Sequence, residues 1–107
     1  ADVNAAAQGD NGKTALTAAA NNGNTEIVKM LLDKGANVNA MTKESPGGKT
    51  ALIYAAGNGH VETVKALLER GANPNAKTTR GGDTALKLAK EKGYTAIIDL
   101  LEQAGAK

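Results

Sequence analysis

Two copies of the tripeptide Gly-Lys-Thr are the residues in this sequence that most resemble a chemical site. They stand at residues 12–14 and 48–50, the second inside the stretch SPGGKTAL. A phosphate-binding loop has the pattern G-x-x-x-x-G-K-[ST] between a strand and a helix, where its backbone N–H groups surround the phosphates. The position five residues before the Gly-Lys-Thr glycine holds Ala7 in one copy and Lys43 in the other. No apolar strand precedes either copy, so the sequence argues against a nucleotide site.

The other reactive side chains form no catalytic or metal-binding set. His60 is the only histidine and there is no cysteine, which leaves no histidine pair, no thiolate and no triad. A packing or capping role at the start of a helix is therefore expected for His60. Glu26 and Glu62 each stand three residues before a lysine, the spacing of helix-surface ion pairs. We expect no catalytic residue, no metal ligand and no cofactor.

Composition narrows the class of protein further. The chain has 107 residues and a formal net charge of +2, which fits one domain or one short repeat array. Acidic residues are interleaved with the basic ones, and Tyr54 and Tyr94 are the only aromatic residues, so a nucleic-acid partner is not expected. No apolar run approaches the ~20 residues of a membrane span, and the first residues do not resemble a signal peptide. We expect a soluble protein without a membrane partner; its location stays open.

The elements that must position these residues recur three times along the chain. GKTAL at 12–16 returns as GKTAL at 48–52 and as GDTAL at 82–86, with shifts of 36 and 34 residues. LLDKGANVNA at 31–40 returns as LLERGANPNA at 67–76. Each copy contains a short Ala- and Leu-rich run, a glycine, a second apolar stripe at helical spacing, and a polar segment. The unit predicted is helix, tight turn, helix and extended arm, stacked so that neighbours bury each other's apolar faces.

Local rules assign the ends and the core of these helices. A threonine before each first helix is a predicted N-cap, and a glycine after it is a predicted left-handed turn residue. One leucine in each first helix is expected to anchor it, and the second helices are expected to supply the stacked core. The N-caps are Thr14, Thr50 and Thr84; the glycines are Gly23, Gly59 and Gly93; the anchors are Leu16, Leu52 and Leu86; and the stacked core is Ile27, Leu31, Val64, Leu67, Ile97 and Leu100.

These repeated segments resemble the ankyrin repeat, whose signature is T-P-L-H-x-A in a unit of about 33 residues. The likeness covers nearly the whole chain, although TPLH is replaced by TALT, TALI and TALK. The resemblance implies an all-α solenoid of helix-turn-helix units with β-hairpin-like loops. It divides a single ankyrin-repeat domain, residues 1–107, into the trailing part of a preceding repeat at 1–11, a repeat at 12–47, a repeat at 48–81 and a C-terminal capping repeat at 82–107. Lys87, Lys90 and Lys92 suit such a cap, whose outer face has no neighbour.

The arms are longer than the family's usual loops. They comprise residues 6–11, 41–47 and 77–81. Either the loop lengths have drifted without consequence, or the unequal tips shape a contact surface; we favour the second interpretation because loops on a rigid scaffold often carry function. Asn39 and Asn75 are expected to close turns within the arms through their side chains.

The resemblance implies non-catalytic recognition of a partner protein by a concave face built from arm tips and the exposed sides of the first helices. One alternative is an engineered or excised scaffold with no natural partner, and another is self-association through the first repeat; a monomer is favoured and a homodimer stays open. The predicted contact residues are Asn21, Asn22, Met41, Thr42, Lys43, Glu44, Ser45, Lys49, Asn58, Lys77, Thr79, Arg80, Asp83, Glu91 and Lys92.

Overall fold

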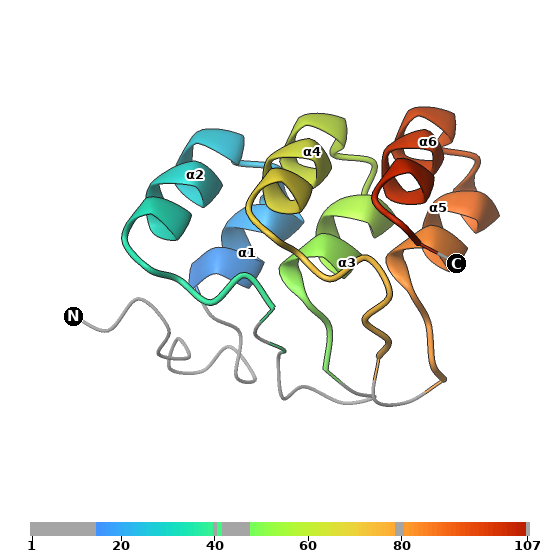
Figure 1. The fold of residues 1–107 in the computed structure, drawn as a ribbon, viewed down its shortest axis with the longest axis horizontal. Helices are drawn as coiled ribbons and strands as arrows, with labels where there is room; N and C mark the ends of the chain where they lie inside the picture. Colours follow the sequence, from blue (N-terminus) through green and yellow to red (C-terminus); the bar gives the residue numbers. More distant parts are fainter. Residues whose placement is uncertain (1–14, 40, 42–47, 79–80, 107) are drawn as a thin grey trace.

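Six short helices form two layers in the computed structural model, which describes residues 15–39, 41, 48–78 and 81–106. The helices are α1 (Ala15–Asn22), α2 (Thr25–Asp33), α3 (Ala51–Gly57), α4 (Val61–Glu69), α5 (Ala85–Lys92) and α6 (Thr95–Gln103). The inner layer is α1, α3 and α5, the outer layer is α2, α4 and α6, and each outer helix follows its inner partner in sequence (Figure 1). The described residues contain no strand longer than an isolated bridge, so the predicted all-α solenoid is confirmed.

The predicted threonine N-caps start two of the inner helices. Thr50 has extended backbone and its hydroxyl oxygen accepts a hydrogen bond from the Ile53 N–H at 3.3 Å. Thr84 accepts in the same way from the Lys87 N–H at 3.1 Å. Each bond satisfies one of the N–H groups that the first turn of a helix leaves without a partner. Thr14 lies outside the described residues.

A glycine joins the two helices of every pair. Gly23, Gly59 and Gly93 have φ of 74°, 77° and 74°, the left-handed region that costs a residue with a Cβ about 1–2 kcal/mol. The chain can therefore reverse within two or three residues and lay each outer helix antiparallel on its inner partner. The predicted turn chemistry is confirmed at all three positions.

The core lies between the two layers and continues from pair to pair. The inner helices contribute the buried anchors Leu16, Leu52 and Leu86, together with small alanines that let α1, α3 and α5 approach closely. Of the core residues expected in the outer helices, Val64, Leu67 and Ile97 are buried, whereas Leu31 and Leu100 are half-buried against the same cluster.

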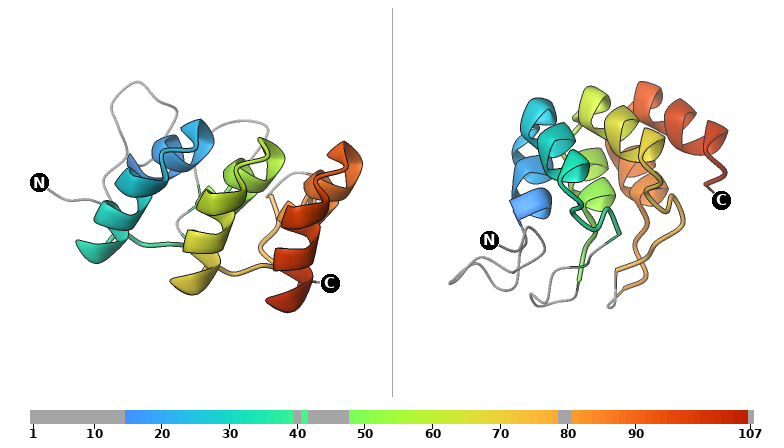
Figure 2. Two further views of the ribbon diagram at one scale, coloured as in Figure 1. Left: turned by 90° about the horizontal axis from the view of Figure 1, so that it is seen from above. Right: turned by 60° about the vertical axis from the view of Figure 1, so that its left-hand side comes forward.

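Ile27 does not belong to the core, and this expectation was wrong. Its side chain is 47% exposed. Thr63 and Ile97 occupy the equivalent positions of α4 and α6 and are buried where each of these helices packs beside the preceding outer helix. Among the described residues no helix lies on the corresponding side of α2 (Figure 2). Helical spacing correctly placed Ile27 on an apolar stripe of α2, but among the described residues no helix packs against this part of the stripe.

In the third arm, the described residues on either side of 79–80 are paired with each other. Lys77 forms an antiparallel bridge with Thr84, and the Thr78 N–H donates to the Asp83 carbonyl at 2.9 Å. The Asp83 N–H in turn donates to the Thr78 hydroxyl at 3.0 Å. These bonds fix the backbone on both sides of the tip.

Candidate functional site

The predicted contact residues separate into two groups in the structure, at opposite ends of the inner helices. Thr42, Lys43, Glu44, Ser45, Thr79 and Arg80 lie outside the described residues. The arm group lies at or just before the beginnings of the inner helices, and the helix-end group lies at their carboxyl ends. The arm group is Met41, Lys49, Lys77 and Asp83; the helix-end group is Asn21, Asn22, Asn58, Glu91 and Lys92. An eight-residue helix such as α5 separates the two groups by about 12 Å.

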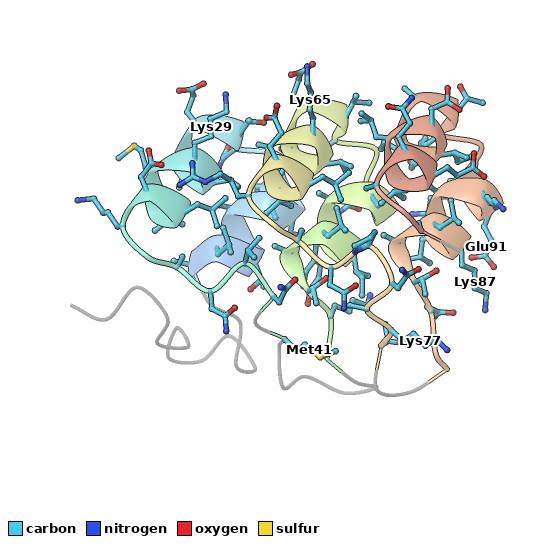
Figure 3. All side chains as sticks on the ribbon, in the orientation of Figure 1. Lys29, Met41, Lys65, Lys77, Lys87 and Glu91 are labelled. Carbon is cyan, nitrogen blue, oxygen red and sulfur yellow. The ribbon has the colours of Figure 1, made fainter. Side chains whose placement is uncertain are left out.

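Met41 and Lys77 mark the edge of the molecule that lies farthest from the outer helices (Figure 3). Met41 is 37% exposed and Lys77 is exposed. Asp83 pairs instead with Lys87, whose ammonium lies 2.8 Å from the Asp83 carboxylate. The hydrogen bond and charge of Asp83 hold the pKa of Lys87 above its ordinary value. The exposed edge therefore offers an apolar and a cationic side chain next to a neutralised ion pair.

The Gly-Lys-Thr segment at 48–50 contacts the helix that follows it. The Thr50 hydroxyl caps α3. The Lys49 ammonium lies 5.5 Å from the centre of the Tyr54 ring, the geometry of a cation–π interaction. Tyr54 itself is almost fully buried. Lys49 and Thr50 thus both contact α3, so this copy of the tripeptide belongs to the start of a helix.

The helix-end group is bonded mainly between neighbouring helix pairs. The Asn58 amide nitrogen donates to the backbone oxygen of Asn21 at 3.2 Å and to its side-chain oxygen at 2.6 Å. The Lys92 ammonium donates to the Gly57 carbonyl at 2.5 Å, where a positive charge also suits the negative end of α3. Lys92 therefore turns toward the preceding pair and not outward over a terminal face. Asn22 and Glu91 are exposed.

His60 packs on the preceding turn and does not cap its own helix. Its side chain makes no hydrogen bond to the start of α4. The Nε2 atom lies 3.0 Å from the Asn21 carbonyl, so Nε2 carries the proton in this contact. A Cβ added to Gly23 would lie 2.7 Å from the His60 Nδ1, and one added to Gly59 would lie 3.1 Å from the Tyr94 ring. The His60 ring thus packs on Gly23, and the Tyr94 ring packs in the same way on Gly59.

The asparagines of the repeated segments ANVNA and ANPNA have two different roles, one within a turn and one between neighbouring pairs. Within each arm the turn is closed by the earlier asparagine: the Asn37 side chain accepts from the Asn39 N–H at 3.0 Å, and Asn73 accepts from the Asn75 N–H at 2.9 Å. Asn39 instead links the segments that precede the second and third arms, because its side chain accepts from the Asn73 N–H at 2.7 Å and donates to the Gly71 carbonyl at 3.4 Å. The Asn75 amide nitrogen likewise reaches the next pair, where it donates to the Gly105 carbonyl at 3.1 Å. The turn-closing bonds seen here are thus accepted by Asn37 and Asn73, whereas Asn39 and Asn75 were expected to make them. The second asparagine of the repeated segments ANVNA and ANPNA was the available signal for this ladder.

Sequence reasoning also missed the exposure of the first outer helix. Met30 is 57% exposed and lies one turn from Ile27 on α2. The equivalent residues Ala66 and Leu100 are buried and half-buried. This apolar strip is a second surface, on the outer layer and separate from the arm group.

The described residues hold no group of three or more His, Cys, Asp or Glu side chains arranged for a metal ion. Within the same part of the chain, no helix is both long enough and apolar enough to cross a membrane. Buried polar side-chain atoms there all have hydrogen-bond partners. The polar groups left for contact with another molecule are therefore those of the exposed side chains.

Comparison with known proteins agrees with this architecture. A family model described as ankyrin repeats in three copies matches residues 1–78 and, a second time, residues 43–107. A search of curated proteins found no match. Ankyrin repeats generally act as protein–protein interaction modules and are typically non-catalytic. Because the two matches together span the whole chain and the helices stack as three pairs, this protein belongs to the ankyrin-repeat family.

Proposed function

We propose that this chain binds a partner protein through the arm group and the exposed side of the inner helices. The observation that carries the proposal is a fixed backbone beneath exposed side chains. The Asn39 side chain accepts from the Asn73 N–H at 2.7 Å, which joins the segments that precede the second and third arms, and the Thr78–Asp83 pair holds the base of the third arm. Met41 and Lys77 project from that frame (Figure 3). A surface ordered before binding loses less conformational entropy when the complex forms.

The side chains of this surface suit a protein better than a nucleic acid. Met41 supplies a flexible, polarisable apolar contact that adapts to different partner shapes. Lys77 supplies a cation, while Lys87 is paired with Asp83 and Glu91 adds a further acid nearby. Recognition of a nucleic-acid backbone needs a strongly basic stripe, which this mixture of signs does not make.

Site-specific photo-crosslinking in a cell extract tests the proposal. A photoreactive residue replaces Met41, Lys77 or, as the control, Lys29, which is exposed on the outer layer (Figure 3). We expect the Met41 and Lys77 derivatives to capture the same protein and the Lys29 derivative not to capture it. Equal capture from all three positions would contradict the assigned surface. Capture from none would favour a scaffold without a natural partner.

A second candidate function is self-association through α2, favoured by its exposed strip of Ile27 and Met30. Leu31 completes the strip, since residues at i, i+3 and i+4 share one face of a helix. Glu26 lies in the first turn of α2 and Lys34 follows its last turn. Two copies related by a two-fold axis perpendicular to α2 would set α2 antiparallel to its partner, so each Glu26 would approach a Lys34.

The other end of the stack does not suit this strip. Lys87 and Lys90 stand where the second pair has the buried Ile53 and Ala56, and both are exposed. Head-to-tail stacking would bury these charges, which is costly. Sedimentation velocity over a concentration series tests the two-fold dimer: the unmodified chain should shift toward the dimer, whereas Met30→Glu should stay monomeric. A shift that survives Met30→Glu, or a monomer throughout, would contradict it.

A further inference from the structure

A groove of about 290 Å³ runs along the outer layer between α4 and α6. Half-buried leucines make its apolar floor, and charged or polar side chains make its rim. Lys65, on the rim, lies on top of the outer layer, on the side of the molecule away from Met41 and Lys77 (Figure 3). Its lining residues are Lys65, Leu68 and Glu69 from α4, with Leu100, Gln103 and Ala104 from α6 and its C-cap.

At the equivalent six positions between α2 and α4, an ion pair connects the two helices. These positions are Lys29, Leu32, Asp33, Ala66, Glu69 and Arg70. There Arg70 reaches from the end of α4 to α2, and its Nη2 donates to the Asp33 carboxylate at 2.6 Å. At the next position in the stack the arginine is replaced by Ala104, whose methyl group cannot reach across. Glu69, which stands where Asp33 stands, has no ion-pair partner among the described residues.

We propose that the groove between α4 and α6 binds an arginine side chain of a second protein. The aliphatic part of that arginine lies on Leu68 and Leu100, and its guanidinium group pairs with the Glu69 carboxylate. The amide oxygen of Gln103 is a further acceptor on the same rim. The chain itself contains the template, because Arg70 already makes this contact with Asp33 one pair earlier.

The chemistry of the groove selects arginine over other cations. A guanidinium group is planar, presents five donors and is more weakly hydrated than an ammonium, so it pairs with a carboxylate while lying against apolar side chains. Lys65 does not exclude it, because Lys29 stands at the equivalent place beside the Arg70–Asp33 pair. Exposed ion pairs are individually weak. The groove therefore acts as one anchor in a larger interface, on the outer layer and independent of the arm group.

A titration followed by methyl NMR at Leu68 and Leu100 tests this assignment. The probe is a blocked Gly-Arg-Gly tripeptide, and its control is the same peptide with neutral citrulline, which keeps the shape and loses the charge. We expect saturable shifts at both leucines with the arginine peptide only. Equal shifts with the citrulline peptide, or no shifts with either, would overturn the proposal.

Matched variants of the chain separate the groove from the general charge of the molecule. Glu69→Gln should lower the affinity for the arginine peptide about two- to fivefold. Glu62→Gln removes the same charge from the first turn of α4, outside the groove lining, and should leave the affinity unchanged. Ala104→Arg should abolish the shifts by supplying the arginine from within the chain. Equal weakening by Glu69→Gln and Glu62→Gln, or binding that persists in Ala104→Arg, would overturn the assignment.

Discussion

Replacing Gly23 with alanine tests the contact between neighbouring turns more sharply than any core substitution, because Gly93 supplies a matched control. Both glycines end an inner helix with φ of 74°. A Cβ on Gly93 would meet nothing within 4 Å, whereas a Cβ on Gly23 would lie 2.7 Å from the His60 Nδ1. The two substitutions therefore share the strain of a left-handed alanine and differ in the collision with His60.

The structure sets the size of both effects. The left-handed conformation should cost Gly93→Ala about 1–2 kcal/mol. Gly23→Ala carries that cost and must also displace the His60 ring, which gives up the 3.0 Å contact with the Asn21 carbonyl. A lost hydrogen bond is worth about 1 kcal/mol. The free energy of unfolding should thus fall by about 2–3 kcal/mol in Gly23→Ala.

Urea denaturation followed by far-UV circular dichroism measures the difference. We expect Gly23→Ala to be less stable than Gly93→Ala, and the excess to disappear when both are compared in a His60→Ala background. If the two alanine variants are equally stable, or if the excess survives removal of His60, the packing of one turn on the next does not contribute as described.

Three further substitutions probe the core and the ion pairs. Leu52→Ala, at a buried anchor in the central pair, should cost about 2–5 kcal/mol; an unchanged denaturation midpoint would refute its place in the core. Arg70→Ala removes an exposed pair with Asp33 and should cost less than about 1 kcal/mol, with the difference shrinking at high salt; a larger cost that salt leaves unchanged would refute the surface character of the pair. Because Asp83 raises the pKa of Lys87, the pair contributes stability at neutral pH that is lost as the pH rises through the folded-state pKa of Lys87. Asp83→Asn should lower that pKa in an NMR titration, and an unchanged value would show that Asp83 is not its cause.

Local signals allowed much of the fold to be predicted from the sequence. Thr50 and Thr84 cap helices because a threonine before a helical run offers its hydroxyl to the first turn. Gly23 and Gly59 have positive φ because a glycine after such a run closes it at little cost. These features depend on a few neighbouring residues, and the three copies repeat them, so each copy supports the interpretation of the others.

Contacts between helix pairs were harder to predict. Helical spacing put Ile27 on the apolar stripe of α2, but it could not show which neighbour covers that stripe. Composition identified Asn39 as polar and suited to turns, yet its partner, the Asn73 N–H, lies 34 residues away. Lys92 was expected on the outward side of the last pair and instead turns back to the Gly57 carbonyl. In each case the outcome depends on which face of one helix pair contacts the next pair. The sequence of a single repeat does not specify that contact.

The candidate surface was only partly predictable for the same reason. Met41 and Lys77 are exposed on the arms, as the arm-tip hypothesis requires. Asn21 and Asn58 are bonded to each other across two helix pairs, so their side chains already have a structural role. The groove beside Ala104 depends on the replacement of Arg70 by Ala104 at equivalent places of neighbouring pairs, and the contact that Arg70 makes with Asp33 is evident only in the structure.

The most direct test of the proposed recognition surface is the affinity of a partner captured at Met41 for two charge-matched variants. Lys77→Glu reverses a charge on the arm, and Lys29→Glu reverses one on the outer layer (Figure 3). Isothermal titration calorimetry should show clear weakening for Lys77→Glu and an unchanged affinity for Lys29→Glu. Full affinity in Lys77→Glu, or equal weakening in both variants, would contradict binding through the arms.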